Sequence, residues 1–344
     1  MIPNQPNALL NQLARVFKTI TMTSATEFLV NNERSRAEPP YVMQQLQAFR
    51  PEMPKHVLRL QFHLYQTAYC QNGESNAPVA ESPTMDAAFV SQLAAVSATK
   101  DRWEAGWTAE AIDPNGYLTA IRYANRQRFP SGQYRFSGQQ PSQAGQLVEV
   151  FFSGHSTSIQ PGFVYILGEE LSQIEDDTNW LRIYFNIQVD GAVTLVRKVS
   201  TLLNQFCIPF KLKLLASPVV FQRVDSAVLF VNRRFYRPVL YLLTRVIPDI
   251  SSVLDKATPL FSKRLYAGVG LAEDPGNGES FGLNRCLLLA QAVWGAYERG
   301  DQSSDARIEE LKRLFADQRL SFGAPHLSAN KEDHYVANGR WHCE

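Results

Sequence analysis

Two lysines in one short apolar segment are the residues best suited to chemistry. In residues 208–215 (IPFKLKLL), Lys211 and Lys213 alternate with apolar residues, so a strand places both on one face. A lysine becomes a general base only when its pKa falls, and like-charge repulsion together with partial burial lowers it. The alternative is the solvated outer face of an edge strand, where lysines discourage aggregation.

Further cations follow along the chain. Arg223 precedes Asp225 before the next expected strand, Lys263 lies in an extended segment, and Arg285 lies in the first turns of an apolar helix. Guanidinium forks bind tetrahedral oxyanions, so these residues predict a local phosphate site. For Arg285 the alternative is an ion pair, because an unpaired buried charge is costly. Three acidic residues precede it closely: Glu273, Asp274 and Glu279.

Residues 181–189 (LRIYFNIQV) predict a strand with one polar face. Arg182, Tyr184 and Asn186 alternate on that face, and Asp190 is expected to cap the helix that follows over residues 191–206. If this strand pairs with residues 208–215, Lys211 and Lys213 share a cleft with these side chains.

Motifs for metals, nucleotides and hydrolysis are missing from the sequence. The four cysteines and six histidines have no metal-ligand spacing, and no phosphate loop, HExxH or GxSxG occurs. His155 is the only histidine that we consider for catalysis, and loop solvation is its alternative. We expect neither a metal nor an organic cofactor.

Charge and hydropathy exclude several classes of partner. Lys+Arg 34 against Asp+Glu 33 give a net charge of +1, which provides no global attraction to nucleic acid or to an anionic membrane. No apolar run approaches the ~20 residues that span a bilayer, and the N-terminus lacks the order of a signal peptide. The scattered cysteines favour a reducing, cytoplasmic setting.

The order of elements predicts an α+β fold. Apolar spacing indicates three helices, near residues 9–17, 57–65 and 89–96, within a helical N-terminal region over residues 1–100. Residues 103–152 alternate as antiparallel strands, and strands then alternate with helices in a domain over residues 101–320, a mixed or antiparallel sheet with packed helices. Residues 321–344 are expected to form an irregular C-terminal tail.

Five of these segments together resemble a known family. The segments LRIYFNI, IPFKLKLL, RVDSAVLFVNR, TPLFSKRL and GLAEDPGNGESFGLNRC are similar to the Hop-A-type family, first named for type III secretion effectors of plant-pathogenic bacteria. Gly106-Trp107 and residues 162–165 (GFVY) resemble earlier landmarks of the family, so the likeness covers roughly residues 100–300.

The resemblance implies two classes of function. Some members are effectors that bind a secretion chaperone and a host immune component. Others accompany a small kinase in peptide-modifying gene clusters, where they are implied to be lyases that eliminate phosphate from phosphorylated Ser or Thr during lanthipeptide or thioamide-peptide maturation. The second group, and with it the expected fold, distantly resembles the phosphothreonine lyases.

The lyase chemistry needs a base, an acid and cations that hold phosphate. The resemblance assigns the base to Lys211 or Lys213 and the phosphate to Arg223, with Arg285 as a late second arginine and Lys263 and Arg182 as further cations. The general acid, which protonates the leaving oxygen, is where this chain differs from the phosphothreonine lyases. Those lyases carry a Lys-x-His motif on the preceding strand, and this chain has Tyr184-Phe185-Asn186 there. Because Asn186 cannot transfer a proton, Tyr184, His155 or another lysine must do so, or the chain only binds.

The first interpretation is therefore a lyase that acts on a phosphorylated precursor peptide made by a separate kinase. The alternative is a non-enzymatic, type III effector-like interaction module that engages a secretion chaperone or host protein after export by a signal-less route. Residues 6–21 favour the enzyme, because they have helical character whereas an export leader is Ser-rich and disordered.

Overall fold

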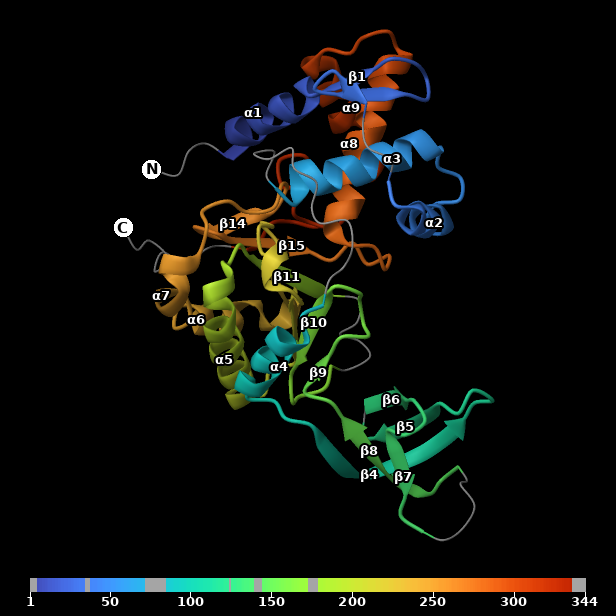
Figure 1. Ribbon diagram of the computed structural model, residues 1–344, viewed down its shortest axis with the longest axis vertical. Coiled ribbons are helices and arrows are strands. Elements are labelled where there is room, and N and C mark those ends of the chain that lie inside the picture. Colours follow the sequence, from blue (N-terminus) through green and yellow to red (C-terminus); the bar gives the residue numbers. More distant parts are fainter. Residues whose placement is uncertain are drawn as a thin grey trace.

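The structure is a computed structural model that describes residues 5–34, 38–71, 85–123, 125–138, 144–172 and 179–335. It has an α+β architecture, as the sequence predicts, with antiparallel sheets and packed helices (Figure 1). Within these ranges, no helix is long and apolar enough to cross a membrane.

A seven-stranded antiparallel sheet forms the centre, in the order β14-β15-β11-β13-β12-β10-β9. Its strands are β9 (His155–Ser156), β10 (Phe163–Leu167), β11 (Trp180–Phe185), β12 (Phe210–Leu215), β13 (Ala227–Asn232), β14 (Lys263–Tyr266) and β15 (Val269–Glu273). The expected direct pairing of the two polar strands is wrong, because β13 lies between β11 and β12. The strand predicted over residues 181–189 also ends early, at Phe185.

One face of this sheet packs against α4 (Ala87–Val96), α5 (Val189–Gln205), α6 (Tyr236–Leu243) and the short α7 (Ile247–Ile250). Helix α5 forms because Leu195, Val196, Val199 and Leu203 recur at helical spacing and are all buried. The expected cap at Asp190 is wrong, since the helix begins at Val189. Asp190 instead lies in the first turn, where its charge favours the helix dipole.

The opposite face packs against the N-terminal and C-terminal helices. These are α1 (Gln5–Lys18), α3 (Lys55–Leu64), its π-helical continuation (Tyr65–Tyr69), α8 (Phe281–Glu298) and α9 (Ser304–Asp317), while α2 (Pro40–Phe49) contacts α3. Helix α8 is buried on nearly every side, and the Ser280 hydroxyl caps it by accepting a hydrogen bond from the Leu283 N–H. The face therefore carries a second apolar core that includes Tyr69, Tyr184 and Phe281.

The first hundred residues contain more than the three predicted helices. The predictions correspond to α1, α3 and α4, while α2 and a small sheet of β1 (Ile20–Met22), β2 (Phe28–Val30) and β3 (Glu33–Arg34) were not predicted. Strands of two or three residues are too short to show a period of alternation.

Residues 102–152 form a separate five-stranded sheet, here called the β-module. Its strands are β4 (Arg102–Ile112), β5 (Leu118–Arg122), β6 (Asn125–Phe129), β7 (Tyr134–Phe136) and β8 (Leu147–Phe152), in the order β6-β5-β4-β8-β7. The module has its own small core around the fully buried Trp107. Figure 1 shows it at the end of the molecule away from α1 and α9.

The C-terminal segment after α9 is irregular, as expected, and it packs against β15 and α8 in its described part. The Glu273 N–H donates to the carbonyl of His326, and Leu327 and Tyr335 are buried. Residues 336–344 of the predicted tail lie outside the described residues. The strand order and these helices together set the surroundings of the cationic residues.

Candidate functional site

Strand register places four of the predicted residues on one face of the central sheet. Lys213 pairs with Val228 of β13, which pairs with Tyr184 of β11. Lys211 pairs with Phe230, which in turn pairs with Arg182. Side chains of directly paired residues point to the same face, so both lysines share the face of Arg182 and Tyr184 across the intervening strand.

Lys213 has the properties of a base. Its Nζ lies 3.6 Å from the centroid of the Phe163 ring and has no hydrogen bond or ion pair with any residue that the structure describes. The side chain is only partly exposed. Burial, opposed by Asp225 and aided by Arg223 and Arg182, lowers the pKa of Lys213 to about 7. The amine is therefore available in its neutral form near neutral pH.

Arg223 is held from two sides beside Lys213. Its Nε and Nη2 each donate to one oxygen of Asp225, both at 2.8 Å, and Nη2 also donates to the Tyr65 hydroxyl at 2.9 Å. Its guanidinium carbon lies 5.8 Å from the same Phe163 ring. Among the described residues, Nη1 has no acceptor. A preorganised arginine thus keeps one nitrogen for a ligand next to the lysine amine.

Arg182, in the neighbouring row of paired residues that contains Lys211 and Phe230, is also held by a carboxylate over an aromatic ring. Its Nε donates to Asp274 at 2.9 Å, and its Nη2 donates to Asp274 and to the carbonyl of Glu279. The guanidinium lies over Phe230, 5.1 Å from the ring centroid, and Nη1 has no acceptor within the described part of the chain. Two arginines on this face therefore each have a carboxylate partner and an unused nitrogen, and both act electrostatically on Lys213.

Tyr184 supplies a buried hydroxyl on the row of Lys213. The side chain is 2% exposed, and its hydroxyl has no hydrogen-bond partner among the described residues. Burial raises the pKa of Tyr184 to about 12, although Arg182 opposes this. The hydroxyl stays protonated at neutral pH, so it is a possible proton donor. We call Lys213, Arg223, Arg182 and Tyr184 the lysine site.

Two predicted catalytic residues lie outside this group. Lys211 shares the face but is exposed, with its Nζ 5.1 Å from the centroid of the Trp180 ring. Asn186 follows the end of β11, where its side-chain amide donates to the carbonyl of Ala257 at 3.1 Å. That contact holds the loop before β14.

The structure does not bring Lys263 and Arg285 to the lysine site. Lys263 pairs with Asp333 at 2.6 Å, and strand pairing aligns it with Leu271, one residue out of phase with Tyr184. Arg285 is 2% exposed and donates to the carbonyls of Pro325 and Leu327 at 3.0 and 2.6 Å. The alternative reading of Arg285 as an ion pair finds no described carboxylate within hydrogen-bond distance, because carbonyl oxygens of the C-terminal segment and the Asn284 side-chain oxygen accept its hydrogen bonds instead.

His155 lies on the other face. It pairs with Ile166, whose row continues through Leu212 and Leu229, one residue out of phase with Lys213. Register thus separates His155 from the lysine site.

Sequence reasoning missed the residues that hold the arginines. Tyr65 comes from the π-helical turn, far away in the sequence, and no local signal indicated it. Asp225 stands two positions after Arg223, a spacing that could have suggested the pair. Asp274 is the first residue of the motif loop over residues 274–279 (DPGNGE). Its carboxylate accepts hydrogen bonds from the Gly276 N–H and from Arg182.

The same loop also forms hydrogen bonds with residues of α8 and of the segment after α2. Glu279 is buried and accepts hydrogen bonds from Arg50 at 2.9 Å and from Asn284 at 3.1 Å. The long motif of the sequence therefore orients Arg182 rather than supplying a reacting group. Within the described ranges, no three His, Cys, Asp or Glu side chains gather in a way that would hold a metal ion.

Two solved structures and one protein family are similar to this chain. Two solved structures are similar: an effector protein from Pseudomonas syringae pv. tomato strain DC3000 (14% identity, 84% of this chain and 97% of that chain, TM-score 0.45) and one from Pseudomonas syringae pv. syringae strain 61 (14%, 84% and 95%, TM-score 0.42). No curated protein matches. The profile of the HopA1 effector protein family matches residues 154–327, half of the chain, which spans the central sheet and the lysine site. The chain belongs to the HopA1 effector protein family.

Proposed function

We propose that this chain is a lyase that eliminates phosphate from phosphorylated Ser or Thr in a peptide modified by a separate kinase. One observation carries the proposal: the unpaired amine of Lys213, with its pKa lowered to about 7, lies next to Arg223, whose Nη1 lacks a partner among the described residues. A neutral amine beside a free guanidinium nitrogen is the pair that β-elimination from a phosphoester needs.

The proposed reaction uses each group once. Arg223 and Arg182 hold the phosphate through their Nη1 donors, and the Lys213 amine removes the Cα proton. The electrons of the Cα–H bond form the Cα=Cβ bond while the Cβ–O bond breaks and phosphate leaves. Tyr184 is the proposed donor to the leaving oxygen, since its hydroxyl stays protonated. Lys213 ends as an ammonium, Tyr184 as a phenolate that recovers its proton from water, and the peptide carries a dehydroamino acid.

The arrangement supports this division of labour for a physical reason. An arginine stays charged at any ordinary pH and presents a planar fork, whereas a lysine gives up its proton once it is desolvated. Asp225 and Asp274 keep the two guanidinium groups in place, so little reorganisation is required when phosphate binds.

Mass spectrometry of a synthetic phosphoserine peptide tests the proposal. We expect the peptide to lose phosphate and to leave a dehydrated residue, while the same peptide without phosphate stays unchanged because hydroxide is a poor leaving group. The Lys213→Arg chain is the matched control. A product with a regenerated hydroxyl would indicate a phosphatase, and an unchanged phosphopeptide would refute the lyase.

The alternative function is a non-enzymatic, effector-like interaction module. The observation that favours it is the outer face of the β-module, where the large side chains of Trp103, Ile121 and Leu147 are exposed. Under this alternative a secretion chaperone or host protein is the partner, and the phosphopeptide experiment gives no product.

A further inference from the structure

A stacked pair of tyrosines connects the helices on this face of the sheet to Arg223. Tyr65 and Tyr69 belong to the π-helical turn after α3, and their rings stack with centroids 5.5 Å apart and planes at 15°. The Tyr65 hydroxyl accepts the hydrogen bond from Arg223 Nη2 at 2.9 Å. Single π-helical turns are rare and occur frequently at functional sites. We call Tyr65 and Tyr69 the tyrosine pair.

The backbone of the same turn also holds the segment that carries Arg223. The Cys70 N–H donates to the carbonyl of Tyr65 at 2.9 Å, five residues back, which closes the π-helical turn. The Cys70 carbonyl in turn accepts a hydrogen bond from the Val224 N–H at 2.9 Å. The turn therefore contacts Arg223 at its guanidinium group and the backbone directly after it.

Gly282 lies against the tyrosine pair. It belongs to the long motif over residues 270–286 (GLAEDPGNGESFGLNRC) and is the second residue of α8. A Cβ atom at this position would lie 2.6 Å from Cε1 of Tyr69 and 2.8 Å from Cε2 of Tyr65. Carbon atoms pack at about 3.5–4.0 Å, so any larger residue would displace the two rings.

The rings have little room to move away. Tyr69 is 2% exposed, and its ring also contacts that of Phe281, 6.4 Å between centroids. Glycine is a poor helix former, so helix propensity alone would favour alanine at position 282. Close packing against the tyrosine pair gives a physical reason for the glycine.

We propose that Tyr65 and Gly282 are positioning residues for the phosphate group of the substrate. Gly282 makes room for the tyrosine pair, and the Tyr65 hydroxyl directs the free Nη1 of Arg223 towards the phosphate. This inference rests on the proposed function and assigns a role to the second half of the long motif. Asp274 in its first half holds Arg182, so one motif positions both phosphate-binding arginines.

A binding experiment that needs no turnover tests the inference. The probe is a fluorescent peptide with the phosphonate analogue of phosphoserine, in which a CH2 group replaces the bridging oxygen so that no phosphate can leave. The reference is the same peptide with serine. Anisotropy titrations of both peptides compare the parent chain with Tyr65→Phe and Gly282→Ala.

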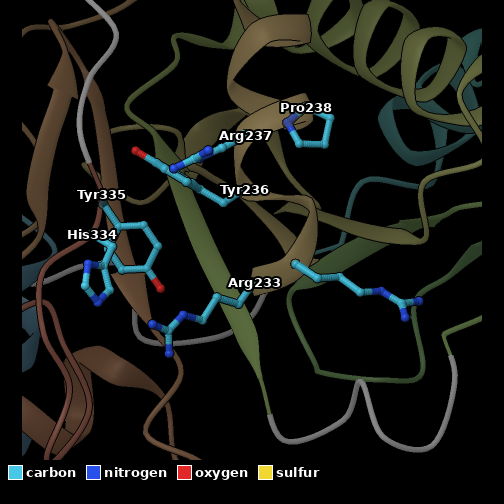
Figure 2. Close-up of a pocket in the computed structure, with 7 residues that line it drawn as sticks. Arg233, Tyr236, Arg237, Pro238, His334 and Tyr335 are labelled. Atoms are coloured by element: carbon cyan, nitrogen blue, oxygen red, sulfur yellow. The ribbon is translucent and has the colours of Figure 1, made fainter.

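Three variants are matched controls. Gly295→Ala makes the same change in the same helix, where the added Cβ meets the end of the Glu310 side chain at 2.7 Å. Tyr134→Phe removes a hydroxyl that donates to the carbonyl of Gly116 in the β-module. Arg237→Gln removes an arginine from the pocket at the beginning of α6, on the other face of the sheet (Figure 2).

We expect Tyr65→Phe and Gly282→Ala each to weaken binding of the phosphonate peptide about tenfold, the size of one hydrogen bond to a charged group. Affinity for the serine peptide should stay the same, and the three controls should match the parent with both peptides. A full phosphonate preference in both variants overturns the inference. Equal weakening of both peptides by Tyr65→Phe indicates a merely structural role and also overturns it.

The two variants support each other. If Gly282→Ala fails to fold, Tyr65→Phe decides the matter, because it removes a single oxygen atom. If a folded Gly282→Ala chain keeps the preference that Tyr65→Phe loses, the role of Gly282 is refuted and that of Tyr65 stands.

The failure of each proposal is distinguishable. If both variants lose the phosphonate preference but the parent eliminates no phosphate from a phosphoserine peptide, the positioning role stands and the lyase falls. If the parent eliminates phosphate and both variants keep the preference, the lyase stands and the positioning role is refuted.

Discussion

At the scale of single residues, Lys213 and the two arginines near it have different proposed roles. The lysine removes a proton, and Arg223 and Arg182 neutralise the charge of the phosphate. Burial moves the pKa of the lysine towards neutrality, and the nearby Arg223 and Arg182 act in the same direction. The guanidinium groups themselves stay charged because their carboxylate partners, Asp225 and Asp274, offset the cost of their burial. Lys211 lies in the row of Arg182 but is exposed, so Lys213 is our candidate for the base.

The pH dependence of elimination tests this assignment. We expect kcat/KM to rise with pH and to level off above an inflection near the pKa of Lys213, about 7, because only the neutral amine removes a proton. Lys213→Arg should lower kcat by about 10²–10⁴-fold with phosphopeptide affinity largely kept, whereas Lys211→Arg should retain both rate and profile. Loss of turnover in the Lys211 variant alone would contradict the choice between the two lysines.

The same amine should be visible in stability. Its pKa is about 7 when folded and near 10.5 when unfolded, so between these values the unfolded chain holds the extra proton and stability rises with pH. Below pH 7 the penalty for the buried charge is fully present. Lys213→Met should therefore be more stable than the parent at pH 6, with a difference that shrinks as pH rises. Urea unfolding at several pH values measures this, and a pH-independent difference would argue against the lowered pKa.

At the scale of elements, the loop between β15 and α8 connects the site to the helical layer. Asp274 holds Arg182 on β11, and Glu279 holds Arg50 after α2 and Asn284 on α8. The loop over residues 274–279 contacts several distant elements. These contacts explain why a long polar motif stands between the buried strand β15 and the buried helix α8. Its role is to position the arginine.

Asp274→Asn should loosen Arg182 while leaving the fold intact, because the Glu279 contacts remain. We expect affinity for a phosphopeptide to fall about tenfold, the value of one charged hydrogen bond, while affinity for the unphosphorylated peptide stays the same. A merely structural role would weaken both equally. Asp317→Asn, which removes a partner of Arg313 on the exposed side of α9, is the control and should change neither.

At the scale of the whole molecule, the β-module is attached to the body at two adjacent points. Asp101 accepts hydrogen bonds from the Ser153 hydroxyl and the Gly154 N–H, and Arg102 pairs with Phe152. The core of the module is built around Trp107, whereas the lysine site is built from the central sheet and the helices above it.

Removal of residues 103–151 should therefore leave the body folded. An Asn-Gly turn can connect the two chain ends that the deletion leaves, Arg102 and Phe152, as a β-hairpin, because these residues are already paired. We expect the shortened chain to unfold cooperatively and to keep the pH profile of elimination, because the site makes no use of the module. Near-UV circular dichroism and the elimination assay check this. An insoluble or molten chain would show instead that the module stabilises the body.

Local periodicity in the sequence determined the α+β class and much of the element order. Alternation over residues 210–215 put both lysines on one face of β12, and the helix predicted over residues 191–206 corresponds closely to α5. These features depend on residues a few positions apart, which is why the sequence alone reveals them. The same reasoning overlooked α2 and β1–β3, whose patterns are too short.

Only the tertiary structure decided which cations meet. Strand β13 lies between β11 and β12, and Lys213 is nevertheless on the same sheet face as Tyr184. Tyr65, from a helical turn far away in the sequence, hydrogen-bonds to Arg223. Arg285, similar to Arg223 in the sequence, is instead satisfied by the carbonyls of the C-terminal segment. The lowered pKa of Lys213 arises from burial and from charges that strand order and helix packing bring together, and neither is encoded in the spacing of neighbouring residues.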